Sequence, residues 1–396
     1  MTITETCLDS ETTGLIDCVV KPDNAVRGTV STGGSARPGV VMVDVARRAG
    51  VSQKTVSRVV NGAPHVRPEV RDRVLAVIGE LGYRPNVAAR ALVTQRTHVI
   101  GVLAVGLPAF GPTLRVVSLE HGARRRGYEL ALASLPDMSS TGLRTAIDGL
   151  LARGVEGIAL EVPNQLVDVG EAALRGVPIV TSVGRIAGVR RQAVVDTLQA
   201  DIGRLATEYL IGLGHETVFH VAGPVEWDAS RRRREGWSAA LAAAGRRPPE
   251  VLTGDWSAGS GYAHGQRLAA RPEVTAIFTA NDSQAMGVMR ALAEAGRAVP
   301  GDVSVVGVDD VPEAEFQMVP LTTVRSDQAA IADRVLSELV ALIEGREPAP
   351  GAPLTPELVI RSSTGPSPGY RAALPSDRPL PVTFSSHSTS KEGTHV

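Results

Sequence analysis

Residues 43–61 read VDVARRAGVSQKTVSRVVN, and this stretch decides the fold of the N-terminal part of the chain. Its apolar spacing predicts two short helices, because residues four apart share one face of a helix. Gly50 supplies the tight turn between them, and the hydroxyl of Ser52 is placed to cap the second helix. The inner face of the first helix is formed by two such pairs, Met42 with Ala46 and Val45 with Ala49. This layout is that of a helix-turn-helix.

The second helix has an outward face that suits DNA. Val56, Val59 and Val60 point inward, and the opposite face carries two polar pairs four apart, Gln53 with Ser57 and Lys54 with Arg58. These side chains present an amide, an ammonium, a hydroxyl and a guanidinium, the groups that bind base edges and phosphates. An ordinary amphipathic helix pair with a solvated polar face is the alternative, and the pattern alone does not decide between the two.

The charge distribution favours a partner of opposite charge. A chain of 396 residues, 43% of them apolar, has room for two or three domains. Residues 40–98 contain ten basic and four acidic side chains and carry +6, so the remainder carries −7. A small basic unit on an acidic body is typical of a DNA-binding headpiece joined to a domain that does not bind DNA.

Several function classes are disfavoured. The two cysteines, Cys7 and Cys18, lie in the polar N-terminal stretch and provide neither a disulfide framework nor zinc-ligand spacing. We find no secretory signal and no apolar run of the roughly 18 residues that a membrane span needs, and we therefore expect a cytoplasmic protein. Walker loops and nucleophile elbows are absent, and glycine-rich 259–265 lacks the lysine of a phosphate loop. We expect no cofactor, no metal and no catalytic residues.

The chain divides into five segments by composition. Residues 1–39 are polar without period and are predicted to be disordered; a start of translation near Val40 or Met42 is an alternative for this extension. Residues 40–84 form the headpiece, whose third helix begins at Pro68 without a capping Ser or Thr and ends at Gly82. Residues 85–97 form a hinge, 98–364 the core, and the Pro- and Ser-rich 365–396 a disordered tail.

From Val99 onward, apolar runs alternate with helical stretches. This alternation predicts parallel sheets that are covered on both faces, and the length predicts two α/β subdomains. The expected strands are 99–105, 129–133, 157–162, 178–183, 218–222, 276–280 and 303–308. The expected helices are 113–126, 142–152, 199–213, 230–244, 257–268, 282–295 and 327–344. Ligands bind such sheets at the carboxyl ends of the strands, where functional side chains are therefore expected.

The stretch from Val41 to about Thr364 resembles the lactose/galactose-repressor family of bacterial transcription regulators, including its lactose-responsive members. The resemblance rests on the helix-turn-helix and on motifs in matching order: YRPN at 83–86, IGV at 100–102, AGP at 222–224, Arg233 before GW at 236–237, GDWS at 254–257, AND at 280–282, VGVDD at 306–310 and PLTT at 320–323. It implies a small all-α headpiece, a hinge helix, and a periplasmic-binding-protein-like core of two parallel-sheet subdomains. We expect crossings near Val183, near Arg325 and between Gly345 and Leu354, so that 98–182 joins 326–345 and 183–325 joins 353–364.

The resemblance assigns roles in DNA binding. Base reading falls to Gln53, Lys54 and Arg58, with Arg58 suited to guanine and Gln53 to adenine. Phosphate contacts or helix caps fall to Ser52, Thr55, Ser57 and Asn61, and for Thr55 and Ser57 a purely structural role is equally open. In the hinge, Asn86, Ala89 and Leu92 match the family's minor-groove contacts, with Leu92 as the apolar wedge; packing of Leu92 against the core is the alternative. The partners implied are a near-palindromic double-stranded operator and a second copy of the chain.

The resemblance also implies a small-molecule effector, expected to be a saccharide, in a cleft between the subdomains. Asn281 and Asp309 follow apolar strands and are placed to hydrogen-bond hydroxyl groups, Trp256 offers a flat face to a sugar ring, and Arg233 matches the family's sugar-binding arginine. For Arg231, Arg232 and Arg234 we expect a solvated surface, and for Trp256 a core or lid position is the alternative. We also assign Phe110, in the loop after the first strand, and Gln165 to this site.

Two departures weaken a galactoside assignment. Gln165 and Thr181 stand where lactose-responsive members have a carboxylate and an aromatic side chain. We expect a repressor of carbohydrate-utilisation genes whose operator affinity changes when the effector binds. A sugar-binding protein without a regulatory role, a regulator of a non-sugar pathway, and an α/β enzyme that uses Asp282, Asp309 or Asp310 are the competing interpretations.

Overall fold

The structure is a computed structural model, and it describes residues 40–60, 62, 64–84, 91, 94–105, 110–135, 139–163, 171–348 and 351–369. The chain forms two compact units, residues 1–86 and 87–396. The expected extension 1–39 and most of the tail lie outside the described residues, as do most of the hinge positions.

The headpiece contains α1 (Met42–Ala49), α2 (Gln53–Val60) and α3 (Pro68–Leu81). Gly50 ends α1 with φ +65°, a left-handed conformation that glycine adopts without strain. The three helices enclose a small core in which Val45, Val56 and Val74 are completely buried. Arg67 precedes α3 without a side-chain cap. The expected helix-turn-helix is thus confirmed, with Val60 only partly buried.

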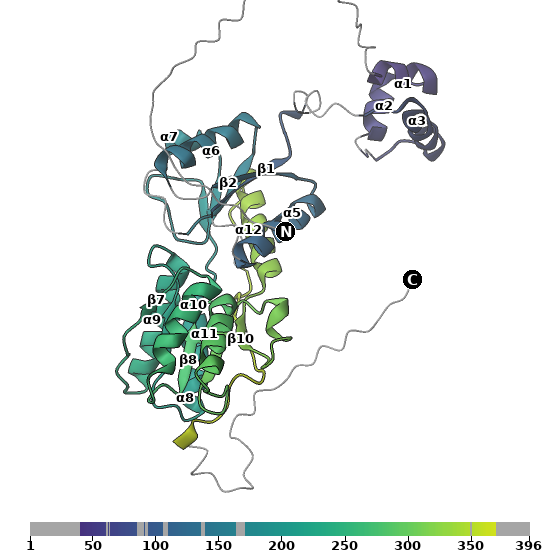
Figure 1. Ribbon diagram of the computed structural model, residues 1–396. Coiled ribbons are helices and arrows are strands. Elements are labelled where there is room, and N and C mark those ends of the chain that lie inside the picture. The colour runs from purple at the N-terminus through teal and green to yellow at the C-terminus, as the bar shows by residue number, and fades with distance from the viewer. Residues whose placement is uncertain are drawn as a thin grey trace, which may run out of the picture. The chain divides into compact units, whose positions relative to one another are not determined.

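The first half of the core, here called the first lobe, is built on a five-stranded parallel sheet. Its order is β2 (Glu129–Leu135), β1 (Val99–Val105), β3 (Gly157–Glu161), β4 (Ile179–Thr181) and β5 (Gln192–Val194). One face packs on α6 (Ser140–Ala152) and α7 (Glu171–Leu174), and the other on α5 (Phe110–Arg125) and α12 (Gln328–Ile343). Figure 1 shows α6 and α7 on the side of the sheet opposite to α5 and α12.

The second lobe is built on a six-stranded sheet. Its order is β11 (Glu357–Val359), β10 (Thr322–Arg325), β9 (Ser304–Val308), β8 (Ala276–Thr279), β6 (Phe219–Ala222) and β7 (Leu252–Thr253). Only β11 runs antiparallel to its neighbour. Side chains of α10 (Ala258–Ala269) and α11 (Asp282–Glu294) cover one face, and those of α8 (Gln199–Gly212) and α9 (Asp228–Ala243) cover the other. A 3₁₀ turn spans Pro312–Ala314.

Glycines set the helix pairs of the second lobe at very short separation. A Cβ on Gly203 of α8 would collide with the backbone of Arg233, and one on Gly236 of α9 would collide with the backbone of Ala200. Gly261 of α10 and Gly287 of α11 make the same kind of contact with the opposite helix. Gly261 and Gly265 of the glycine-rich stretch 259–265 therefore serve helix packing. In the other pair, α9 is fixed where it carries Arg233 to the end of the sheet.

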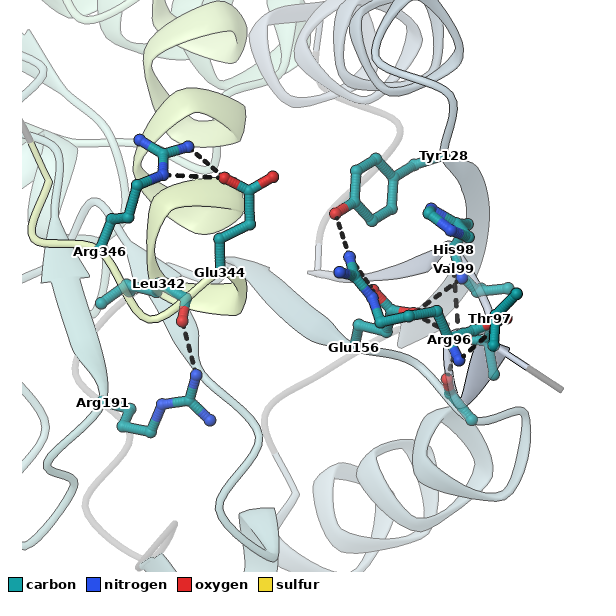
Figure 2. A network of polar contacts seen from close by, with 12 residues as sticks. Arg96, Thr97, His98, Val99, Tyr128, Glu156, Arg191, Leu342, Glu344 and Arg346 are labelled. Atoms are coloured by element: carbon teal, nitrogen blue, oxygen red, sulfur yellow. Dashed lines mark hydrogen bonds and ion pairs between the residues drawn. The ribbon is translucent and has the colours of Figure 1, made fainter. Parts of the chain in front are cut away.

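The two-lobed α/β fold is confirmed, but two of the expected boundaries are wrong. Gln192–Val194 pairs with β4 of the first lobe. Arg191 donates a hydrogen bond to the Leu342 carbonyl at the end of α12 (2.5 Å, Figure 2). The chain therefore leaves the first lobe after Val194 rather than near Val183. A three-residue strand behind a glycine-containing loop has no apolar run to reveal it. The expected tail starts too early, because Gly365 and Ser367 are hydrogen-bonded to Ser304 and Leu213 in the second lobe.

The chain enters the first lobe through a polar anchor, drawn in Figure 2. Arg96 donates from Nε to Glu156 (2.8 Å) and from Nη2 to the Tyr128 hydroxyl (2.8 Å), and the amide of His98 donates to the same carboxylate (2.9 Å). Burial acts to raise the pKa of Glu156, but the hydrogen bonds from Arg96 and His98 together hold it below its usual range. The residues after the hinge are thus fixed to the segments that directly precede β2 and β3.

None of the helices in the described part of the chain is long and apolar enough to cross a membrane.

Candidate functional site

The outward face of α2 offers three side chains for DNA. Gln53, Lys54 and Arg58 are exposed, and none of them makes a hydrogen bond or ion pair with the described residues. The neighbouring arginines of α1 differ, since Arg48 pairs with Glu80 at 2.6 Å and Arg47 with Asp44 at 3.4 Å. The three predicted base readers are therefore the polar groups of this helix that remain available.

The predicted capping role of Ser52 is confirmed. Its Oγ accepts from the Thr55 amide at 3.1 Å and lies 2.9 Å from the Thr55 hydroxyl. Both hydroxyls thus support the start of α2, and the half-buried Ser57 also has a partner within the protein. The other predicted DNA contacts, Asn61, Asn86, Ala89 and Leu92, lie outside the described residues.

A cavity opens between the carboxyl ends of the two sheets. Together with the open space at its mouth it measures about 830 Å³. The second lobe contributes Arg233, Trp256, Asn281 and Asp309, which are four of the six predicted effector residues. The lobes also touch directly beside the cavity, where the Asp228 amide donates to the Pro163 carbonyl at 2.7 Å.

Arg233 is held rigidly at the cavity. Its side chain is buried, donates from Nε to Gln199 Oε1 at 2.8 Å and from Nη1 to the Ala280 carbonyl, and stands 5.8 Å from the centre of the Trp256 ring. Its neighbours Arg231 and Arg234 are exposed as expected, and Arg231 pairs with Asp228 and Glu235. Arg232 differs from the expectation, because it is half-buried and pairs with Asp228 and Asp196. Within the described residues, Arg233 Nη2 donates no hydrogen bond.

Asp309 lies on the same wall of the cavity as Arg233. Its carboxylate makes no hydrogen bond to the described residues. Burial raises the pKa of Asp309 to about 6, against the opposing effect of Arg233 and Arg115. Asp309 and Asp310 have φ of +110° and +54°, conformations that cost energy in residues other than glycine and are common at functional sites. A free, desolvated carboxylate is a strong acceptor for ligand hydroxyl groups.

Asn281 and Trp256 are coupled to each other. Asn281 Oδ1 caps α11 by accepting from the Gln284 amide at 2.9 Å, and its Nδ2 donates to the Trp256 carbonyl at 2.9 Å. Trp256 has φ +71°, its ring lies against Gly223, where a Cβ would overlap it, and it meets Trp227 edge-on at 5.6 Å. Asn281 thus holds the backbone of Trp256 and the start of α11 in place at the cavity.

The other predicted cleft residues lie elsewhere. Phe110 does not line the cavity and packs instead against the core of the second lobe, because α5 begins earlier than expected and takes it into the helix. Gln165 falls outside the described residues. Thr181 is buried in β4 and accepts from the Val183 amide. Asp282 is fully buried behind the cavity against Thr323 and the Val311 amide, and Asp310 pairs with Arg325 and Arg361.

The polar side chains of the first-lobe wall were not predicted from the sequence. Arg115, Glu161 and Gln328 line the cavity, as do Trp227 and Gln199 from the second lobe. Glu161 was detectable, since it ends an apolar strand in the same way that Asp309 follows one. Arg115 and Gln328 lie on helices, where sequence gave no indication that they face a cavity.

Both the headpiece and the two-lobed core are similar to known protein families. Residues 41–86 match the family described as bacterial regulatory proteins, lacI family, and residues 207–364 match a periplasmic binding protein-like domain. The lactose operon repressor of Escherichia coli strain K12 is 32% identical over 342 residues, 85% of this chain and 93% of its own length. The transcriptional regulator CelR of Thermobifida fusca is 35% identical over 327 residues, 79% and 94% of the two chains.

Solved structures agree with these relationships. The Lac repressor dimer bound to operator and the anti-inducer ONPF has a TM-score of 0.73 at 33% identity, covering 83% of this chain and all of the other. The CelR–cellobiose complex has a TM-score of 0.59 at 32% identity and covers 82% and 99%. The matched lengths include both the helix-turn-helix and the two lobes. The chain therefore belongs to the lacI family of bacterial regulatory proteins and is a DNA-binding transcriptional regulator rather than an enzyme.

Proposed function

We propose that this regulator is a repressor that binds a near-palindromic operator as a homodimer, with α2 in the major groove. Gln53, Lys54 and Arg58 carry this proposal, because they are exposed and have no hydrogen-bond or ion-pair partner among the described residues. Arg58 has the fork of donors that binds guanine O6 and N7, and the amide of Gln53 matches adenine. Because the target is chromosomal DNA, we place the protein in the cytoplasm.

The second copy has a candidate docking surface on the second lobe. Phe316 is 82% exposed and Met318 is fully exposed, in the loop between the 3₁₀ turn and β10. Large apolar side chains exposed to this degree are typical of interfaces. A twofold dimer presents two headpieces to two half-sites, which is the symmetry that a near-palindromic operator needs, and the Lac repressor is a dimer in its operator complex.

We infer that the effector is a small saccharide that binds in the interlobe cavity. The arrangement of Asp309, Arg233 and Trp256 supports this, because a carboxylate and a guanidinium suit vicinal hydroxyl groups and an indole suits the C–H face of a sugar ring. The relative CelR was solved with cellobiose. A ligand that touches both lobes favours one lobe arrangement, and the polar anchor at Arg96 and Glu156 links that arrangement to the hinge.

A thermal-shift screen of the full chain against sugars tests the effector assignment. A sugar present at about 100 times its Kd adds about 2.7 kcal/mol to the free energy of unfolding and raises Tm. We expect the shift to be lost in Asp309→Ala and to persist in Asp302→Ala, a carboxylate of the same lobe whose side chain instead accepts from the Ala298 amide. Equal shifts in wild type and Asp309→Ala would place the ligand elsewhere.

A further inference from the structure

The first-lobe wall of the cavity carries a network of charged and polar side chains. Arg115 of α5 donates from Nη1 to Glu161 Oε2 at 2.9 Å and from Nε to Gln328 Oε1 at 3.0 Å. Glu161 ends β3, and Gln328 begins α12. Three separate elements thus bring one guanidinium, one carboxylate and one amide to the same side of the cavity.

This network is buried, and a buried ion pair is a weak source of net stability. The side chain of Glu161 is 6% exposed and that of Arg115 is 13% exposed. Removing two such charges from water costs about as much as their attraction returns, so apolar residues of the same size would serve the fold at least as well. The rest of the first-lobe interior consists mainly of apolar side chains, so an ion pair is an exception there. The location of the pair at a ligand cavity therefore points to a binding role.

The network has hydrogen-bonding capacity left over. Within the described residues, Glu161 Oε1 accepts no hydrogen bond, and neither Gln328 Nε2 nor Arg115 Nη2 donates one. A hydroxyl group both donates and accepts, so vicinal hydroxyl groups can satisfy a carboxylate and a guanidinium at once. An alkyl or aryl group would desolvate these atoms without replacing the hydrogen bonds, and such a mismatch is heavily penalised.

The opposite wall repeats the same chemistry. Asp309 and Arg233 offer a free carboxylate and a free guanidinium nitrogen on the second lobe. The third acid of the cavity, Asp228, is already paired with Arg231 and Arg232. Among the described residues that line the cavity, one cation and one available anion on each wall leave no excess charge for a phosphate or carboxylate group. This lining suits a neutral ligand.

Building on the proposed saccharide site, we infer that Arg115, Glu161 and Gln328 select the effector: a neutral sugar with free hydroxyl groups toward both walls. The network recognises hydroxyl groups directly and is a specificity determinant of this cavity. In either orientation of an aryl glycoside in the cavity, the aryl group contacts a wall that carries charged side chains. Aryl glycosides and sugar phosphates or uronates are therefore poor ligands for this regulator.

Calorimetric titration of the full chain tests this inference. The probes are D-glucose, D-galactose, D-ribose, D-xylose, lactose, cellobiose and maltose, followed by the p-nitrophenyl glycoside and the 6-phosphate or uronate of any sugar that binds. Wild type is expected to bind the free sugar about 10 to 100 times more tightly than either derivative, from the loss of hydrogen bonds to charged groups.

The matched variants are the double substitution Arg115→Leu with Glu161→Leu, and Arg124→Leu. Arg124 lies on the same helix and pairs with Glu120 at 2.6 Å, but it is exposed to solvent. The double variant removes both charges together, so it leaves no unpaired ion and is expected to keep the wild-type Tm. It should bind the free sugar about 10 to 100 times more weakly and prefer the aryl glycoside relative to wild type. Arg124→Leu should bind like wild type.

The outcomes separate this inference from the function on which it rests. If no sugar binds to wild type, the saccharide assignment itself is wrong. If a free sugar binds equally to wild type and to the folded double variant, or if wild type binds the aryl glycoside as tightly as the free sugar, the saccharide assignment stands and the role of the network is refuted.

Discussion

At the scale of single residues, DNA recognition depends on whether a side chain of α2 is already engaged. Ser52 and Thr55 are committed to the helix cap, whereas Arg58 is exposed and makes no hydrogen bond or ion pair with the described part of the chain. We predict that Arg58→Ala weakens operator binding by about 1–3 kcal/mol and relaxes sequence preference at one position of each half-site. Gel-shift titration on an operator selected from random DNA measures this.

Arg73→Ala is the matched control, since Arg73 is an exposed arginine on α3 of the same headpiece. It removes one positive charge and is expected to weaken binding slightly and uniformly across sequences. If Arg58→Ala and Arg73→Ala had the same effect and the same sequence preference, Arg58 would be a general electrostatic contact and not a base reader.

His215 gives a second prediction at this scale, with a defined pH dependence. Burial lowers the pKa of His215 to about 4, and its ring contacts Thr275, Ser304 and Gly365. The unfolded chain, with a pKa near 6.5, takes up a proton first as the pH falls. The contribution of neutral His215 to stability is therefore complete above about pH 6.5 and declines toward pH 4.

We expect His215→Gln to unfold more easily than wild type at pH 7.5, and the difference in unfolding free energy to narrow by up to about 1.4 kcal/mol per pH unit between pH 6.5 and 4. Burial also raises the pKa of Asp282, to about 8, and of Asp309, to about 6, which acts in the opposite direction. Those groups are present in both proteins and cancel in the difference. A gap that stays constant with pH in urea titrations would show that His215 does not titrate as described.

At the scale of secondary-structure elements, the position of α9 determines the position of Arg233. Gly236 lets α9 lie against the backbone of α8 at Ala200. We predict that Gly236→Ala destabilises the protein by about 1–3 kcal/mol, as overpacking does, and also weakens sugar binding because α9 carries Arg233 away from Gln199. Thermal unfolding and calorimetric titration measure the two effects.

Gly212 is the matched control within the partner helix. It is exposed near the end of α8, and a Cβ there would meet no atom within 4 Å. Gly212→Ala should stabilise the protein by about 0.5–1 kcal/mol through helix propensity and leave sugar binding unchanged. Equal Tm values for the two variants would contradict the close packing of α8 on α9.

The elements also show what sequence can reveal. Long apolar runs such as Val99–Val105 and Ser304–Val308 are visible because both faces of a parallel strand are buried. Short strands such as Gln192–Val194 and the antiparallel Glu357–Val359 form because they pair with a neighbouring strand. The local sequence pattern does not indicate such pairing. In the same way, strand ends indicated Asp309, but Arg115 and Gln328 reach the cavity from helices whose orientation only tertiary packing determines.

At the scale of the whole molecule, the proposed dimer depends on the exposed apolar loop of the second lobe. We predict that Phe316→Glu with Met318→Glu converts a dimer to a monomer, because charges in the centre of an apolar interface remain desolvated. Sedimentation velocity measures the change. Val225→Glu, which replaces an apolar residue that is 60% exposed elsewhere in the same lobe, should leave the dimer intact. A dimer that survives the double substitution would move the interface to another face.

The central claim is that a sugar in the interlobe cavity controls how tightly the headpiece holds DNA. The most direct measurement is the operator Kd with and without the sugar identified by thermal shift, in wild type and in Asp309→Ala. We predict that the sugar changes the wild-type Kd by about 5- to 150-fold, and that the same sugar concentration leaves the Asp309→Ala Kd unchanged while both proteins bind operator equally without sugar. An unchanged wild-type Kd at saturating sugar, or the same change in both proteins, would contradict the account.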